Sequence, residues 1–416
     1  MTVTPTSWKY DELRRLVAGE RLPLMVVDLD VLDANTRRLT AIVRQAGMTL
    51  RVASKSFRVP ALLERVLEVG GATTRGLMCF SAAEADFLSR QGFDDLLVAY
   101  PTVQEPDLEL LWDARERGVS VTLMIDSQAH VDRLELWWAT RAAGREAPRL
   151  PVCVDADMSY RPLSQLGPHV GPHLGAQRSP VRDVASFRRL LRGLRAARWL
   201  ELRGVMGYEA QLASLGEINP FTPLMNPFKR LFKARSARDV ARKRAALARC
   251  LEQEGFDGLF FNGGGTGSIR TTTREPWLTE VTAGSGFLQS HLFDYFSDNR
   301  NEPACCFALP VTRLPEPGVV TCQSGGFIAS GEIGPDKAPV VFLPQGLEPF
   351  DAEGFGEVQT PLKVPANVSL ALGDPVFLRP AKAGEIAERF NEYLLKRASR
   401  IVGRAKTYRG FGHCFY

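Results

Sequence analysis

Two segments of the sequence carry residue types that could do chemistry together. Lys55 follows an apolar, strand-like run at residues 50–54, and a glycine-rich loop with the sequence Asn-Gly-Gly-Gly-Thr-Gly-Ser occupies residues 262–268. A buried lysine amine can bond covalently to an aldehyde, because desolvation lowers its pKa. Glycine-rich loops present backbone N–H groups to a phosphate without obstruction by Cβ atoms. Together the two segments predict a site for a phosphorylated aldehyde, whereas each alone could be a surface lysine or an ordinary turn.

From residue 23 to about residue 298, short β-rich runs alternate with longer amphipathic stretches. The stretch at residues 33–46, for example, places Leu39, Ile42 and Val43 at helical spacing. Such alternation is typical of βα units, and about eight of them favour a closed (β/α)8 barrel, a TIM barrel, over an open sheet. The predicted strands lie at residues 24–28, 50–54, 77–80, 96–99, 121–126, 152–155, 204–207, 259–262 and 280–283.

Beyond residue 303 the sequence changes to β-runs separated by glycine and proline turns. The change predicts a second, mainly antiparallel β domain, so the fold class is α/β with two domains. We expect the barrel at residues 23–300 and the second domain at residues 301–416 together with residues 1–22. A helix at residues 383–398 and a packed N-terminal helix near residues 11–16 would complete the second domain. Its predicted strands lie at residues 318–322, 339–343, 359–364, 368–372 and 375–378.

Polar residues fall at the ends of several predicted barrel strands. In barrels of this kind the C-terminal ends of the strands surround the active site. We therefore expect the site among these residues, although each could end a strand simply because polar residues favour turns. They are Lys55, Asp155, Asp157, Tyr208 and Asn262.

The composition is that of a globular protein without a polyanionic partner. The chain has 416 residues, 45% hydrophobic and 24% charged, with 52 basic and 47 acidic residues interspersed. Arginine-rich stretches near residues 182–203 and 229–249 are interpreted as solvated helix faces, since no nucleic-acid recognition motif accompanies them. No apolar run reaches the roughly 18 residues of a membrane span, and the seven cysteines form no C-x-x-C pair. We expect a cytoplasmic protein with reduced thiols and no nucleic-acid or membrane partner.

In five segments the chain resembles the fold-type III pyridoxal-phosphate enzymes, in the D-threonine aldolase and D-serine dehydratase branch of the alanine racemase superfamily. The resemblance covers nearly the whole chain and implies the cofactor pyridoxal 5′-phosphate. The segments are Pro-Leu-Met-Val-Val-Asp at 23–28 before a helix with Asn35, Ala-Ser-Lys at 53–55 before Pro60, Gln-Arg-Ser-Pro-Val at 177–181, Gly-Gly-Thr at 264–266, and Thr-Glu-Val-Thr-Ala-Gly-Ser-Gly at 279–286 before Asp294-Tyr295.

The resemblance implies roles for single residues around the cofactor. Lys55 would be the catalytic residue and form a Schiff base with the cofactor aldehyde. Arg178 would face the pyridine ring, where an arginine tempers the electron sink because it cannot protonate the ring nitrogen. Tyr208 would line the cofactor, although a core tyrosine is the alternative there.

The resemblance also implies a phosphate site in the last two barrel loops. Gly264, Gly265 and Thr266 would form it together with Gly284 and Ser285. Family members usually carry an aromatic residue after the glycine–serine pair, where this chain has a further glycine at residue 286.

Metal-dependent members of the branch carry a His-x-Cys pair after a Gly-Asp-x-Val segment. Gly-Asp-Pro-Val occurs here at residues 373–376, but Pro-Ala-Lys stands at residues 380–382, so we predict no metal site. Lys382 could supply a positive charge instead, or it could be a solvated lysine. His413 and Cys414 are adjacent, and adjacent side chains rarely bind one metal together. The histidines that could handle protons, or be purely structural, are His173 and His291.

The resemblance implies a lyase that acts on a D-configured or β-hydroxy amino acid by retro-aldol Cα–Cβ cleavage or by β-elimination. A racemase is one alternative, but it needs a second base, and Tyr393, Tyr408 and Tyr416 lie in no recognisable racemase motif. A non-catalytic pyridoxal-phosphate homeostasis protein is another, but such proteins consist of the barrel alone. The resemblance also implies a homodimer in which the second domain of one subunit closes the barrel mouth of the other.

Overall fold

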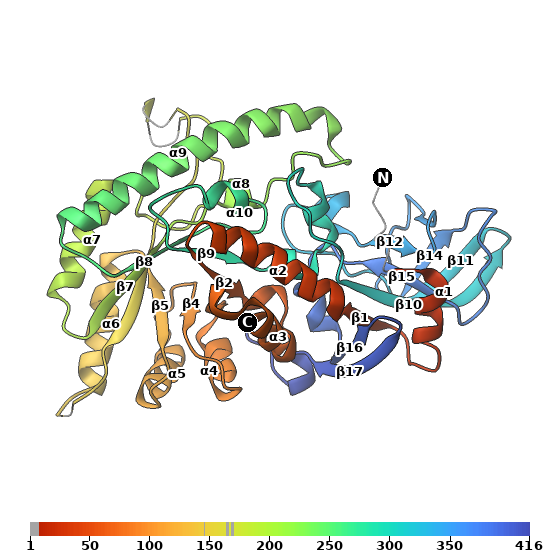
Figure 1. The fold of residues 1–416 in the computed structure, drawn as a ribbon, viewed down its shortest axis with the longest axis horizontal. Coiled ribbons are helices and arrows are strands. Elements are labelled where there is room, and N and C mark those ends of the chain that lie inside the picture. Colours follow the sequence, from red (N-terminus) through yellow and green to blue (C-terminus); the bar gives the residue numbers. More distant parts are fainter. Residues whose placement is uncertain (1–7, 145, 164–165, 168–169) are drawn as a thin grey trace.

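The computed structural model describes residues 8–144, 146–163, 166–167 and 170–416, and its first domain is the predicted parallel barrel (Figure 1). Eight strands pair in sequence order, and β9 closes the barrel by pairing with β2. The barrel strands are β2 (Thr49–Ala53), β3 (Thr74–Cys79), β4 (Leu96–Val98), β5 (Val121–Ile125), β6 (Leu150–Asp155), β7 (Leu200–Met206), β8 (Phe260–Gly263) and β9 (Glu280–Ala283).

Helices form the outer layer of the barrel, and several begin at side-chain caps. Ser81, Ser127 and Asp183 each accept a hydrogen bond from a backbone N–H of the first turn, which fixes the starts of α4, α6 and α7. The helices of this domain are α2 (Leu29–Gln45), α3 (Pro60–Gly70), α4 (Ala82–Arg90), α5 (Glu105–Glu116), α6 (Gln128–Arg141), α7 (Val184–Ala196), α8 (Ala210–Ala213), α9 (Asn226–Gln253), α10 (Ile269–Thr272) and α11 (Ser285–Leu288).

The second domain is a sheet in which every pair of strands is antiparallel except β1 with β16. The main path runs β13-β14-β11-β10-β1-β16-β17, and β15 pairs with both β10 and β12. The strands are β1 (Leu24–Asp28), β10 (Cys305–Glu316), β11 (Val319–Gln323), β12 (Val340–Leu343), β13 (Glu348–Pro349), β14 (Gln359–Lys363), β15 (Pro375–Arg379), β16 (Glu392–Arg397) and β17 (Arg400–Lys406).

The N-terminal helix α1 (Tyr10–Leu16) packs on this sheet as expected. Trp8, Leu13 and Val17 bury their side chains against strand residues that include Val26 and Phe377. None of the helices in the described ranges is long and apolar enough to cross a membrane.

Three predicted elements differ from the structure. Residues 24–28 form β1 of the second sheet and not a barrel strand. The sequence could not distinguish the two, because the run is buried throughout and its apolar residues do not reveal which strands it pairs with. The helix expected at residues 383–398 is wrong: a 3-10 turn, η7 (Glu385–Arg389), and strand β16 stand there. Lys396, which falls inside the predicted helix, is buried in β16 and paired with Asp28. Residues 368–372 form no strand.

Candidate active site

A cavity lies among the residues at the C-terminal ends of the barrel strands, where the sequence predicted the site. Six of the eight predicted site residues line it: Lys55, Arg178, Tyr208, Gly264, Gly265 and Gly284. The other lining residues are Ala53, Ser56, Met78, Ala99, Tyr100, Met206, Asn262, Thr282 and Ala283. Thr266 and Ser285 follow directly in the chain, so the structure brings all eight together.

Lys55 occupies the centre of a 3-10 turn, η1 (Ser54–Ser56), immediately after β2. Its Nζ donates a hydrogen bond of 2.8 Å to the hydroxyl of Tyr100 and lies 5.5 Å from the centre of that ring. Tyr100 was not predicted as a site residue. Like Lys55, it lies directly after a predicted strand, and this shared position could have identified it.

Two cations surround the phenol of Tyr100. Arg178 is exposed and places its guanidinium carbon 5.8 Å from the ring centre. Burial alone would raise the pKa of Tyr100, but the positive charges of Lys55 and Arg178 outweigh burial and lower it. The phenol is therefore a group that can hold or release a proton next to the Lys55 amine.

Asp155 ends β6 close to this cluster. Burial, reinforced by the negative charge of Asp126 and opposed by Arg178, raises the pKa of Asp155 to about 7. Asp157, the other carboxylate predicted here, instead accepts hydrogen bonds from the Ser159 amide at 2.8 Å and from Arg161 at 3.2 Å. Asp157 is therefore part of the loop structure and does not line the cavity.

The glycine loop after β8 is shaped by close packing. Gly264 has a left-handed backbone, with φ +86°, and a Cβ on Gly265 would lie 2.7 Å from the Cβ of Ala213. In the loop after β9, a Cβ on Gly284 would lie 2.3 Å from Ser56 Oγ. Gly264 is favoured by its backbone conformation, whereas a side chain at Gly265 or Gly284 would displace its neighbours.

Several backbone amides of the two loops already have partners within the protein. The Gly264 amide donates to Glu209, the Gly265 amide to Ser268 Oγ, and the residue 286 amide to Thr266 Oγ1, at 3.0, 3.1 and 2.9 Å. Within the described ranges, the amides of Thr266 and Ser285 make no such bond. Thr266 and Ser285 both belong to the phosphate site that the resemblance implies, and their amides are available as donors to a phosphate.

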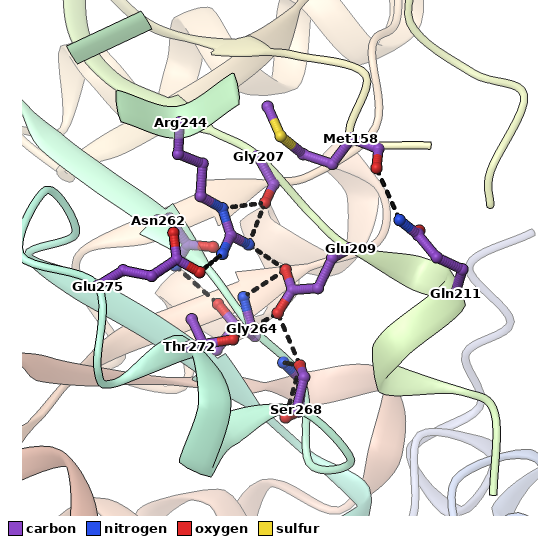
Figure 2. Close-up of polar contacts among 12 residues, drawn as sticks. Met158, Gly207, Glu209, Gln211, Arg244, Asn262, Gly264, Ser268, Thr272 and Glu275 are labelled. Atoms are coloured by element: carbon purple, nitrogen blue, oxygen red, sulfur yellow. Dashed lines mark hydrogen bonds and ion pairs between the residues drawn. The ribbon is translucent and has the colours of Figure 1, made fainter. Parts of the chain in front are cut away.

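Glu209 holds the glycine loop in place (Figure 2). Its side chain is fully buried and pairs with Arg244. It also accepts hydrogen bonds from the Gly264 amide at 3.0 Å, Ser268 Oγ at 2.7 Å and Thr272 Oγ1 at 2.5 Å. Burial would raise the pKa of Glu209, but Arg244 and the three donors lower it, so the carboxylate stays charged.

Arg244 is the other member of this network that the sequence did not reveal. It lies in α9, in the stretch interpreted as a solvated face, yet its side chain is 0% exposed. Arg244 Nη1 lies 2.5 Å from Glu275, and Nη2 donates to the carbonyl oxygen of Gly207 at 2.6 Å. The long helix α9 is thereby tied to the loops after β7 and β8.

A second buried polar network holds two of the residues that line the cavity. Arg51 binds Glu280 through two hydrogen bonds of 2.8 and 2.9 Å and reaches Asp95 at 3.0 Å. Asn262 Nδ2 donates at 2.8 Å both to Glu280 and to Thr282 Oγ1. This chain of bonds fixes Asn262 and Thr282, two of the polar groups that line the cavity.

In the Pro-Ala-Lys segment at residues 380–382, where no metal site was predicted, the side-chain amine of Lys382 makes three hydrogen bonds. Lys382 Nζ donates to the carbonyl oxygen of Ser330, to its hydroxyl and to Glu385, at 2.9, 2.9 and 2.7 Å. A lysine has three N–H donors, so all of them have acceptors. Among the residues that the structure describes, no three His, Cys, Asp or Glu side chains are placed to hold a metal.

The histidines and the C-terminal cysteine have other surroundings. His291 is buried between the Tyr295 hydroxyl at 3.1 Å and the Ala338 carbonyl at 2.8 Å, and burial lowers its pKa to about 4. The ring centres of His413 and Phe87 lie 4.7 Å apart, and Cys414 is exposed. His173 is not a cavity residue. None of these side chains lines the cavity.

The comparisons with known proteins agree with the resemblance drawn from the sequence. The chain is 24% identical over 331 residues to D-threonine aldolase from Arthrobacter sp, covering 78% of this chain and 76% of that protein. It is 24% identical over 263 residues to 3-hydroxy-D-aspartate aldolase from Paracoccus denitrificans (strain Pd 1222), covering 63% of this chain and only 59% of that protein. No family model matches the chain.

Solved structures show the same two-domain architecture. D-threonine aldolase from Filomicrobium marinum superposes with a TM-score of 0.77 at 18% identity, over 94% of this chain and 95% of the other. D-threo-3-hydroxyaspartate dehydratase from Delftia sp. HT23 gives 0.71 at 18% identity, over 94% and 98%. The chain therefore shares the fold of these structures, a closed parallel barrel with a second, mainly antiparallel β domain. Alanine racemase from Bacillus anthracis is a more distant neighbour, with a TM-score of 0.65 at 16% identity over 94% and 99%.

Proposed function

We propose that this protein is a pyridoxal-phosphate-dependent lyase that acts on a D-configured or β-hydroxy amino acid. The observation that carries the proposal is the placement of the Lys55 amine in one cavity with the glycine loops after β8 and β9. Two aldolases that act on D-β-hydroxy amino acids, by their names, are its sequence relatives. The reaction would be retro-aldol Cα–Cβ cleavage or β-elimination.

The residues of the cavity fit pyridoxal phosphate. Lys55 would hold the aldehyde carbon covalently, and the amides of Thr266 and Ser285 would bind the phosphate. Arg178 and Tyr208 line the same cavity and would contact the ring. When bound, the cofactor supplies an electron sink for negative charge at the substrate Cα.

The chain's own contribution to the chemistry is proton handling at Lys55 Nζ. An amine attacks an aldehyde only in its neutral form, so the ammonium must first lose a proton. Tyr100 is 2.8 Å away and has a lowered pKa, which suits it to take that proton and return it. We propose Tyr100 as a catalytic residue beside Lys55.

Among the described residues, the three tyrosines considered as a second base for racemisation do not line the cavity. Tyr393 and Tyr408 are 0% and 1% exposed, and Tyr416 bonds to Arg58. A lyase therefore remains the favoured reaction, and the position of Lys382 suggests that it proceeds without a metal at the second-domain site.

We further propose a homodimer. Apolar side chains gather on the loop before α9 and on the first turns of that helix, where a single copy leaves them exposed. Leu224 is 87% exposed and Phe228 67%. The patch consists of Ile218, Phe221, Leu224, Met225, Phe228 and Leu231. Light scattering of the purified protein, with Leu224→Ser/Phe228→Ser as the disrupted variant, measures the subunit number.

A cytoplasmic location is also part of the proposal. All seven cysteines are free thiols, and six of them are buried. Unpaired cysteines in this number are typical of a reducing compartment.

The experiment that tests the proposed function is a substrate screen. Purified protein supplied with pyridoxal phosphate is incubated with D- and L-forms of β-hydroxy amino acids, and released aldehyde and keto acid are measured. Aldehyde identifies cleavage and keto acid identifies elimination, whereas interconversion of enantiomers without either product would refute the lyase. Lys55→Ala is the control for reaction by free cofactor.

A further inference from the structure

The turn that carries Lys55 ends in an unusual backbone conformation. Arg58 has φ +54°, in the left-handed region, although it is not a glycine and is only 4% exposed. The amides of Phe57 and Arg58 both donate to the Ser54 carbonyl, at 2.9 and 3.0 Å, which closes the turn around Lys55. A non-glycine residue stays in this conformation only where its surroundings hold it there.

The second domain supplies those surroundings. Arg58 Nη1 donates to Glu388 of η7 at 2.6 Å, and Nη2 donates to the hydroxyl of Tyr416. The guanidinium carbon lies 5.2 Å and 5.0 Å from the ring centres of Phe80 and Tyr416. The Arg58 carbonyl accepts a hydrogen bond of 2.9 Å from the Tyr408 amide. Side chain and backbone of Arg58 are thus both bound across the domain boundary.

The same boundary touches Lys55 itself. A Cβ on Gly384, a residue of the second domain, would lie 1.8 Å from the Lys55 carbonyl oxygen. The backbones of the two domains are therefore in direct contact at the reactive residue.

We propose that Arg58 is a positioning residue for Lys55: its guanidinium clamps the Lys55 turn to the second domain and fixes the direction in which Nζ enters the cavity. The inference rests on the proposed function, because it assumes that Lys55 holds the cofactor. It goes beyond that function because it gives the second domain of the same chain a role in orienting the Lys55 amine. The contact to Glu388 is charge-assisted and largely buried, the kind that holds a geometry most firmly.

The test compares Arg58→Ala with a matched variant, Arg65→Ala. Arg65 also belongs to a network that joins the domains, since it binds Asp33 at 2.6 Å and Asp33 binds Arg397 at 3.0 Å, but these residues do not touch the Lys55 turn. Both variants lose one arginine of a network that joins the two domains. We measure thermal stability without cofactor, the dissociation constant for pyridoxal phosphate, and the pH midpoint of the visible absorption band.

Arg58→Ala should weaken cofactor binding by about tenfold or more, as expected for loss of a buried charge-assisted bond, and should move the pH midpoint. Arg65→Ala should lower stability without either effect. Arg58→Lys should restore part of the affinity, and Arg58→Gly should bind cofactor as weakly as Arg58→Ala, because it relieves the backbone but still lacks the clamp. If Arg58→Ala does not fold, Glu388→Gln and Tyr416→Phe remove the clamp from its other side and should give the same shifts.

The outcomes distinguish a failure of the Arg58 inference from a failure of the proposed function. A wild-type protein with no borohydride-reducible band overturns the proposed function and this inference together. A wild-type band with unchanged affinity and pH midpoint in the clamp variants overturns this inference alone, as does an equal effect of Arg65→Ala on both readouts.

Discussion

Replacing Glu209 by glutamine should loosen the glycine loop and weaken cofactor binding at the same time. Every partner of the Glu209 carboxylate is a donor: Arg244, the Gly264 amide, and the hydroxyls of Ser268 and Thr272. An amide in that place turns two N–H groups toward donors and leaves Arg244 with less negative charge. Glu209→Gln therefore breaks a buried network that a carboxylate alone can satisfy.

The size of the effect follows from burial. Removing one partner of a buried ion pair costs about 3–5 kcal/mol. Glutamine keeps one carbonyl oxygen, and Arg244 keeps Glu275 at 2.5 Å, so we expect the lower end, about 3 kcal/mol. Since the pKa of Glu209 is lowered by its partners, this stabilisation is present above its ordinary value of 4.5 and is lost as the pH falls through the lower folded-state pKa.

The assay is urea unfolding at neutral pH, followed by the dissociation constant for pyridoxal phosphate. The control is Glu217→Gln, which also breaks a buried carboxylate, bound to Lys233 at 2.6 Å and to the Ser297 hydroxyl at 2.6 Å. Both variants should lose stability, but only Glu209→Gln should lose cofactor affinity. Equal affinities in the two variants, or an unchanged unfolding midpoint in Glu209→Gln, would refute the role given to this network.

Three further predictions concern the chemistry of the cavity. Tyr100→Phe should lower kcat by about 100-fold with little change in KM, because it removes the proton acceptor of Lys55; unchanged steady-state rates would remove Tyr100 from the mechanism. Asp155→Asn should raise the thermal unfolding temperature at pH 8 and change it little near pH 4. The reason is that the pKa of Asp155 is raised from 3.8 to about 7 in the folded protein, so its ionisation destabilises the fold as the pH rises through that range. A loss of stability at pH 8 would contradict the burial effect. EDTA should leave activity unchanged, since Pro-Ala-Lys stands at residues 380–382 in place of a His-x-Cys pair and Lys382 is bonded to Ser330 and Glu385. Inhibition that zinc or manganese reverses would show a metal site.

The sequence was sufficient to predict the elements that have a local residue pattern. The eight barrel strands and the cavity around Lys55, Tyr208 and Asn262 follow from the alternation of βα units and from polar residues at strand ends. Asp28 shows where such reasoning stops. Its strand resembles one more apolar run of the barrel, and only its pairing with β10 and β16, far along the chain, assigns it to the second sheet.

Buried charged residues were the second feature that the sequence did not predict. Arg244 looks like any arginine of a basic helix, and Glu209 carries no motif, so nothing local announces that they meet under the glycine loop. The conformation of Arg58 is equally hidden, because its positive φ depends on contacts with Glu388 and Tyr416 of the other domain. These features arise from long-range contacts that one sequence does not display.

The most direct test of the account is the absorption spectrum of the purified protein after incubation with pyridoxal phosphate, before and after borohydride. We expect a band near the visible edge that borohydride removes, with the label located on Lys55 by peptide mass spectrometry and absent in Lys55→Ala. A colourless protein, or a label on another lysine in the wild type, would contradict the assignment of Lys55 as the residue that holds the cofactor.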